Sequence, residues 1–213
     1  MTAWFAPLLA LSASPDMASV QLPTAGLSLS IPTGWQQVPT TTLDQAVMDL
    51  RKRAPNAKVN RPVAAFQKLP LTQGELTYPY ILVYVFPSRP PTLSELKAMT
   101  TKLASQQIAG KMKESTNGFI SAAPSFSFDD STLRVKGAFV STVGDVGSVA
   151  NYVEFVPSSN GVTSLNGYML GSNVAAAQQF YGPIFDAAQM DTAHAYSPGH
   201  ESHSLYQPFD WSN

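Results

Sequence analysis

The run Gly26-Leu27-Ser28-Leu29-Ser30-Ile31-Pro32-Thr33-Gly34-Trp35 decides the fold that the sequence predicts. Its three aliphatic residues alternate with two serines, and this period of two predicts a strand with one buried face. Pro32 has no backbone N–H to give to a neighbouring strand, so it ends the strand, and Thr33-Gly34 turns the chain. We expect Trp35 to pack into the core beneath that turn.

Capping residues and apolar residues at helical spacing predict three helices. Thr42-Leu43-Asp44-Gln45 and Thr92-Leu93-Ser94-Glu95 each fit a capping box, in which a threonine hydroxyl and an acid or amide side chain satisfy free backbone amides. The first helix stops before a proline, and the second runs to about Lys113. Asn173 caps the last helix, in which Gly182-Pro183 is expected to produce a kink or a break.

The remaining periodic segments predict strands joined by short turns. They are Val63–Lys68, Tyr80–Phe86, Ser125–Phe128, Leu133–Thr142, Val149–Val156 and Val162–Leu170. The second of these is rich in β-branched and aromatic residues, which predicts burial on both faces. Short turns between strands imply antiparallel pairing, so we predict an α+β fold with helices on a mainly antiparallel sheet. We place an N-terminal arm at residues 1–25, the domain at 26–191 and an extended tail at 192–213.

Two parts of the chain resemble the PsbP-like superfamily. One is Leu29–Trp35, and the other is Tyr152–Val156, a hairpin, Gly167–Leu170 and a helix that ends near Phe185. The superfamily includes the extrinsic photosystem II protein, the yeast Ran-binding nucleotide-release factor, bacterial PsbP-like lipoproteins and secretion-effector chaperones. The resemblance extends over residues 26–190 and implies an αβα sandwich that binds partners. It transfers no catalytic residue, because the superfamily has no shared active site.

The composition favours an exported protein. Charged residues make up 13% of the 213 residues, against roughly 25% in typical globular chains. The chain has no cysteine, which excludes disulfides, a thiol nucleophile and a cysteine zinc site. The apolar run Trp4–Ala13 is similar to the core of a secretory signal peptide and is too short to span a bilayer. The alternative is an N-terminal strand packed on the domain of a cytosolic protein.

Basic residues are concentrated in one part of the sequence. Between Arg51 and Lys113 there are eleven Lys or Arg and two Asp or Glu, although the whole chain has a net charge of −1. This block predicts a basic surface for a protein partner, unless acidic residues from elsewhere lie beside it and neutralise it. A pI of about 6.3 and the lack of interleaved aromatic residues argue against nucleic-acid binding. The candidate contact residues are Arg51, Lys52, Arg53, Lys58 and Arg61.

The C-terminal tail carries the other candidate residues. Its aromatic side chains are unusual in a disordered segment, so they are expected to dock on the chain's own domain or to contact a partner. Its histidines and a carboxylate are of the types that bind Zn²⁺ or Cu²⁺, although a rigid site also needs supporting contacts. The candidates are Tyr206, Phe209 and Trp211 for partner binding, and His200, Glu201 and His203 for a metal.

The sequence therefore favours a non-catalytic binding or assembly module that acts through protein–protein contacts and needs no cofactor. A homodimer is one form that such a module can take. A cytosolic chaperone or adaptor for a secreted effector is the runner-up. The alternative from a different class is a hydrolase or metal-dependent enzyme that uses the tail histidines. Asp129-Asp130 suits a turn better than an acid/base pair, and Gly144–Gly147 is expected to be a hairpin turn.

Overall fold

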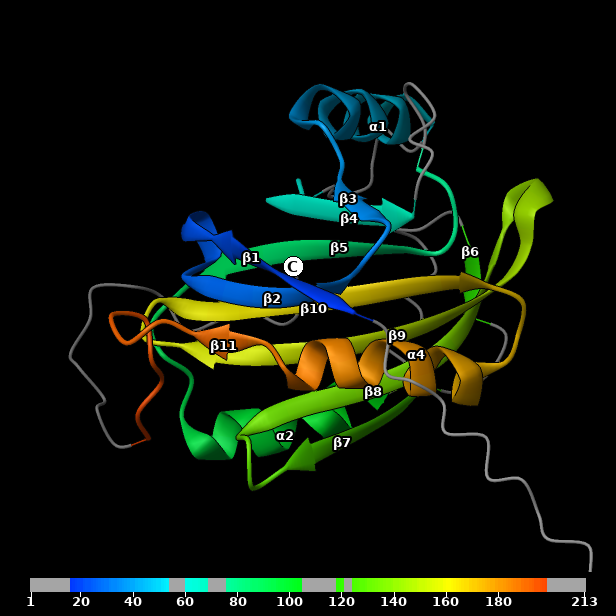
Figure 1. Ribbon diagram of the computed structural model, residues 1–213. Helices are drawn as coiled ribbons and strands as arrows, with labels where there is room; N and C mark the ends of the chain where they lie inside the picture. The colour runs from blue at the N-terminus through cyan, green and yellow to red at the C-terminus, as the bar shows by residue number, and fades with distance from the viewer. Residues whose placement is uncertain (1–15, 54–59, 69–75, 105–117, 121–123, 199–213) are drawn as a thin grey trace, which may run out of the picture.

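The computed structural model describes residues 16–53, 60–68, 76–104, 118–120 and 124–198. Figure 1 shows how these segments are arranged. The elements in chain order are β1 (Met17–Leu22), η1 (Pro23–Ala25), β2 (Leu27–Pro32), β3 (Trp35–Gln37), α1 (Thr40–Arg53), β4 (Ala64–Lys68), β5 (Tyr80–Pro87), α2 (Leu93–Ala104), β6 (Gly118–Ile120), β7 (Ser125–Asp129), β8 (Arg134–Val143), η2 (Gly144–Val146), β9 (Gly147–Ser158), β10 (Gly161–Leu170), α4 (Val174–Asp186) and β11 (Gln189–Met190).

The large sheet has the strand order β3-β4-β5-β10-β9-β8-β6, with β7 also paired to β8. All of these pairs are antiparallel, as predicted. The loop Ser159-Asn160 joins β9 to β10, and η2 joins β8 to β9, so both predicted hairpins are present. Asp129 accepts hydrogen bonds from the backbone amides of Ser131 and Thr132, which forms the predicted turn after β7.

A small second sheet joins the two ends of the described chain. Its order is β1-β2-β11, so β2 lies between a strand that precedes it and a strand from the far end of the sequence. β2 ends at Pro32, as the opening motif predicts. Residues 17–25, which the sequence groups with the N-terminal arm, form β1 and η1, so the boundary at residue 26 falls between the strands of a hairpin.

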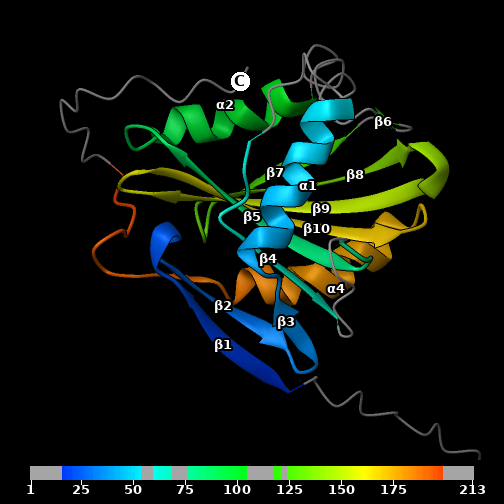
Figure 2. The same ribbon diagram turned by 90° about the horizontal axis from the view of Figure 1, so that it is seen from above.

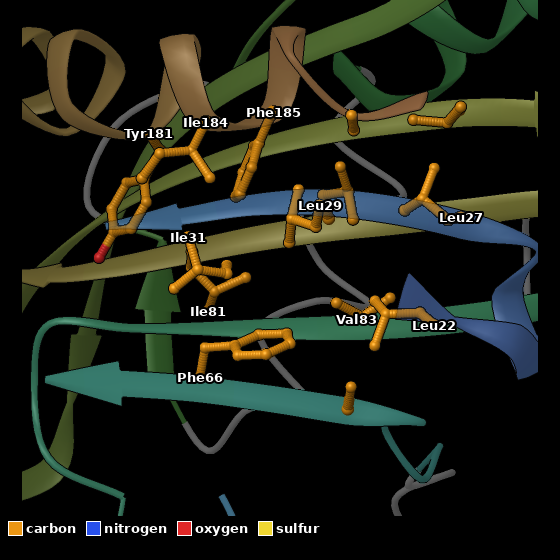
Figure 3. Close-up of a cluster of buried hydrophobic side chains, with 14 of the residues drawn as sticks. Leu22, Leu27, Leu29, Ile31, Phe66, Ile81, Val83, Tyr181, Ile184 and Phe185 are labelled. Atoms are coloured by element: carbon orange, nitrogen blue, oxygen red, sulfur yellow. The ribbon is translucent and has the colours of Figure 1, made fainter. Parts of the chain in front are cut away.

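The main core lies between the two sheets and α4 (Figure 3). The aliphatic side chains of β2 point into it and are at most 2% exposed, because alternate residues of a strand share one face. Trp35 packs at the edge of this core and is half-buried, with its ring centroid 5.8 Å from that of Phe180. The labelled core residues are Leu22, Leu27, Leu29, Ile31, Phe66, Ile81, Val83, Tyr181, Ile184 and Phe185.

Helix α4 covers one face of the large sheet. Asn173 caps it as predicted, since its side chain accepts a hydrogen bond of 3.0 Å from the amide of Ala176. The helix continues through Pro183, so the expected break does not occur. Tyr181 lies over Gly167 of β10, where an added Cβ would stand 2.4 Å from the ring. This close approach explains how a bulky aromatic helix residue fits against the sheet.

Helices α1 and α2 pack on the face of the large sheet opposite to α4. Leu43 of α1 packs with Ala65 and Leu82, and Met99 of α2 packs with Val135. Figure 2 shows α2 on one side of the large sheet and α4 with β1 and β2 on the other. The arrangement is the predicted α+β fold, an αβα sandwich with three main helices.

The two predicted capping boxes have different outcomes. At α2, the Thr92 amide donates to Glu95 Oε2 at 2.8 Å and the Glu95 amide donates to Thr92 Oγ1 at 3.1 Å, which confirms the prediction. At α1 the prediction is wrong, because the helix begins at Thr40 and the carbonyl of Pro39 already accepts from the amides of Thr42 and Leu43. The Gln45 side chain donates to Asp49 instead.

Candidate functional site

The predicted basic surface is partly paired with acidic residues of α1. Arg51 and Lys52 are exposed, but Lys52 Nζ lies 3.4 Å from Asp49 Oδ1. Arg61 Nε lies 2.6 Å from Asp44 Oδ1. These ion pairs fit the alternative expectation, in which acidic residues lie beside the basic block and partly neutralise it. The side chain of Arg53 and all of Lys58 lie outside the described residues.

The described start of the tail packs on the domain. The Asp191 amide donates to the Gly26 carbonyl at 2.8 Å, and the Ser159 amide donates to the His194 carbonyl at 3.0 Å. Tyr196 donates its hydroxyl to the carbonyl of Pro91 at 2.7 Å. The tail is therefore held at the β9–β10 hairpin and at the residues that precede α2. All six tail candidates lie outside the described residues.

A cluster of tyrosines occupies the sheet face that belongs to α1 and α2. We call it the tyrosine face and define it as Tyr78, Tyr80, Tyr84 and Tyr168. The register pairs Tyr80 of β5 with Tyr168 of β10, and their rings stack with centroids 4.8 Å apart. The Tyr78 and Tyr80 centroids are 4.9 Å apart. All four side chains are half-buried, and Tyr80, Tyr84 and Tyr168 pack against the apolar cluster that contains Leu43 of α1.

Three phenols of the tyrosine face, those of Tyr80, Tyr84 and Tyr168, have pKa values above the usual range. Burial raises the pKa of Tyr84 to about 12. The pKa values of Tyr80 and Tyr168 are also raised well above the usual value, first by burial and then by neighbouring tyrosines. At neutral pH these three phenols keep their O–H donors, so each combines an aromatic ring with a hydrogen-bond donor.

Gln67 adds a polar group beside these rings. It lies opposite Tyr80 in the β4–β5 register, so its side chain stands on the same face, and it is 1% exposed. Its Oε1 accepts a hydrogen bond of 3.1 Å from the Thr77 amide. Its Nε2 has no acceptor among the residues that the structure describes. A buried donor without a partner costs about 1–3 kcal/mol, and at 1% exposure the Gln67 side chain is out of reach of a ligand from solution.

A second polar cluster is closed and structural. Glu154 is fully buried, and its carboxylate lies 3.4 Å from Arg134 Nη1 and accepts a hydrogen bond of 3.0 Å from the Tyr152 hydroxyl. Burial is the main cause that raises the pKa of Glu154. Arg134 also donates to the carbonyls of Phe185 and Ala188 at the end of α4. With no exposed surface on the carboxylate, this cluster offers no access to a substrate.

Metal-ligating side chains do not gather in the described part of the chain, where no group of three His, Asp or Glu residues could hold an ion. His194 contacts Asp191, with 2.6 Å between Nδ1 and Oδ1, as part of the tail attachment. Within the same residues, no helix is both long and apolar enough to cross a bilayer.

Comparison with solved structures gives a clear fold match. The fold is similar to that of a cyanobacterial PsbP. That protein, CyanoP from Synechocystis sp. PCC 6803, was solved in solution and superposes with a TM-score of 0.54. The match covers 86% of this chain and 98% of CyanoP at 9% sequence identity. No protein-family model and no curated protein matches the chain.

The likeness to CyanoP shows the fold that the opening motif and the closing block predict. The tyrosine face was missed by the sequence prediction, because β5 was expected to be buried on both faces. In the structure Ile81, Leu82 and Val83 are buried from both faces, whereas Tyr80, Tyr84 and Phe86 are half-buried. The sequence signal that could have indicated this face is that the aromatic residues of β5 occur only at even positions.

Proposed function

We propose that this protein is a non-catalytic, exported binding or assembly module that holds a segment of a protein partner on the tyrosine face. The observation that carries the proposal is the stacked, half-buried rings of Tyr80 and Tyr168. An extended peptide can place apolar side chains against the exposed parts of these rings. Tyrosines are also frequent anchors at protein interfaces.

The surroundings of the face support a protein partner with acidic residues. Leu43 of α1 packs in the same apolar cluster as the tyrosines, and α1 carries the exposed Arg51 and Lys52. The PsbP-like resemblance adds support, since it implies partner binding without a shared active site. Arg53, Lys58 and Arg61 remain proposed contacts of the same basic surface. Reversing the charge of Arg51 and Lys52 should weaken partner capture and its dependence on salt.

The test compares partner capture by the full chain and by two tyrosine variants. Tyr80→Leu and Tyr84→Leu keep apolar bulk and remove the phenols, whereas Val146→Ser alters an exposed apolar residue on the η2 hairpin as a control. Proteins captured from the source cells are identified by mass spectrometry and then titrated against each variant. We expect the same partner with the wild type and Val146→Ser, and at least tenfold weaker binding to the tyrosine variants. Equal binding to all variants that keep the native circular dichroism spectrum would refute the proposal.

The proposed export has its own test. The low charged fraction supports it. Fractionation of the source cells should place the protein outside the cytosol, and a purely cytosolic protein would favour the effector chaperone or adaptor instead. Substituting His200, Glu201 and His203 should leave partner binding unchanged, since the proposed module uses no metal.

A further inference from the structure

Strand β1 forms one edge of the small sheet. It pairs with β2 along all six of its residues, and no strand of the described chain pairs with its other edge. Figure 2 shows β1 at the border of the molecule. Met17, Ala18, Ser19 and Gln21 are exposed to solvent. The strand therefore presents a row of backbone donors and acceptors that another strand can reach.

The other edge strands of the described chain are protected against such pairing. β3 and β6 have three residues each and β11 has two, so they are poor templates for a further strand. β7 is longer, but it packs against α2 and ends in Asp129, which pairs with Lys136. β1 has six residues and contains no charged residue and no proline. An edge of this length without protective residues is typical of a strand that pairs with a partner.

The main core is also incompletely covered along β1. Ala18 and Val20 lie opposite Ile31 and Leu29 of β2, so they share the face that points to the core. The two β2 residues are at most 2% exposed. In contrast, Ala18 is exposed and Val20 is half-buried. A further strand beside β1 would bury more of these two side chains.

A second copy of β1 fits this edge. In an antiparallel pair, directly opposite residues lie on the same face of the sheet. With a two-fold axis at Ser19 or Val20, the core-facing Ala18 meets Val20 or Leu22 of the second copy. On the other face, Ser19 meets Ser19 or Gln21. Since β1 carries no charge and the whole chain has a net charge of only −1, little repulsion opposes the pairing.

We propose that two copies of this protein associate through β1 in antiparallel, two-fold symmetric pairing. The pairing joins the two three-stranded sheets into one continuous sheet. The small sheet lies on the side of the large sheet opposite to the tyrosine face, so the association does not involve that face. It therefore does not rest on the proposed partner binding. One pair of short strands makes a small interface, so the dimer forms in a concentration-dependent way.

Sedimentation velocity of the full chain tests the association. The wild type should shift from monomer to dimer as its concentration is raised toward the solubility limit. Ser19→Lys should raise the dissociation constant about fivefold or more, because two like charges then lie opposite or diagonal to each other. Ser125→Lys is the matched control, since Ser125 is an exposed serine at the start of β7. A wild type that stays monomeric throughout, or equal weakening by both lysine variants, would overturn the proposal.

An exchange of charges distinguishes self-pairing from a general loss of association. Ser19→Glu alone should dimerise as weakly as Ser19→Lys. An equimolar mixture of the two variants should recover the dimer, because opposite charges then meet across the two-fold axis. If both variants keep the native circular dichroism spectrum and the mixture does not recover the dimer, β1 does not pair with a second β1.

The absence of cysteine allows a second test that places no charge at the edge. Ser19→Cys and Ser125→Cys each introduce the only thiol of the chain. A short bis-maleimide should link two copies of Ser19→Cys and leave Ser125→Cys unlinked. Equal cross-linking of the two variants, or none with Ser19→Cys at a concentration where the wild type is dimeric, would place the contact elsewhere and refute the proposal.

Discussion

Glycine is required at positions 26 and 34 by the backbone conformation, and at position 26 also by the lack of space for a side chain. Both have positive φ values, +58° and +86°, in a region that L side chains rarely adopt. At Gly26 an added Cβ would lie 2.4 Å from His194 Cγ and 2.8 Å from His194 Cβ, whereas at Gly34 no atom lies within 4 Å. Gly34 is needed for conformation alone, and Gly26 is also needed for the space that the tail attachment occupies.

Gly26→Ala should therefore destabilise the protein more than Gly34→Ala. The positive φ alone costs roughly 1–2 kcal/mol in each case, and only Gly26→Ala also displaces the turn that contains His194. Urea unfolding of both variants measures the difference in free energy. Adding His194→Ala to Gly26→Ala should recover part of the loss, because it removes the ring atoms that stand closest. Equal losses for both glycines would contradict the close contact.

Glu95 gives a prediction that depends on pH. Burial alone would raise its pKa, but hydrogen bonds from Arg89 and Thr92 hold the pKa below its usual value. A lowered pKa means that the charged form stabilises the fold above about pH 4.3 and that this contribution is lost as the pH falls. Glu95→Gln should thus lose about 1 kcal/mol at pH 7 and approach the wild type near pH 3.

The measurement for Glu95 is thermal or urea unfolding at several pH values. Thr92→Ser is the matched control, since serine keeps the hydroxyl that accepts from the Glu95 amide. It should remain close to the wild type throughout. A difference between wild type and Glu95→Gln that stays constant down to pH 3 would show that the carboxylate charge has no part in it.

At the scale of elements, α4 is fixed at both ends by polar contacts from different parts of the chain. Asn173 caps its N-terminus from the preceding residue, and Arg134 of β8 donates to carbonyls at its C-terminus. The cap is a local pattern that the sequence predicts. The Arg134 contact joins residues about fifty positions apart, so it exists only after the sheet has formed.

Arg134→Met should destabilise the protein by about 3–5 kcal/mol, because it leaves the buried Glu154 carboxylate without its guanidinium partner. Arg134→Lys should recover only part of that loss, since an ammonium cannot reach two carbonyls and a carboxylate with the same planar geometry. Urea unfolding with both variants tests this. Full recovery by lysine would show that charge alone, and not the forked geometry, holds the end of α4.

Local patterns predicted most elements, and long-range contacts account for what they missed. The β2 motif, the hairpins and the Thr92 box rest on neighbouring residues, and all three are confirmed. The start of α1 was misplaced because the Pro39 carbonyl, and not a capping side chain, begins its first turn. The tyrosine face and the place of Gln67 beside it depend on the register of three strands, which composition and periodicity do not specify.

At the scale of the whole molecule, helices α1 and α4 are attached to very different extents. α4 contributes Tyr181, Ile184 and Phe185 to the main core between the two sheets. In contrast, α1 is joined through Leu43 to a smaller cluster. The free energy of local opening is therefore expected to differ between the helices and to be lower for α1 than for α4.

Hydrogen exchange should reveal this difference. Backbone amides of Thr40–Arg53 should exchange by local opening well before those of Val174–Asp186, because α1 can separate without opening the main core. Mass spectrometry of the exchanging chain resolves both helices. Exchange of the two helices at the same rate would mean that they open together with the rest of the molecule.

The position of β2 has a consequence for how the chain folds as it is made. β2 pairs with β1, which is synthesised just before it, and with β11, which is synthesised about 160 residues later. Until Gln189 and Met190 leave the ribosome, one edge of β2 has no neighbour and the main core lacks α4. Such late contacts slow folding and expose apolar strands during synthesis. The nascent chain is therefore most vulnerable to misfolding and proteolysis before the segment from Val174 to Met190 emerges.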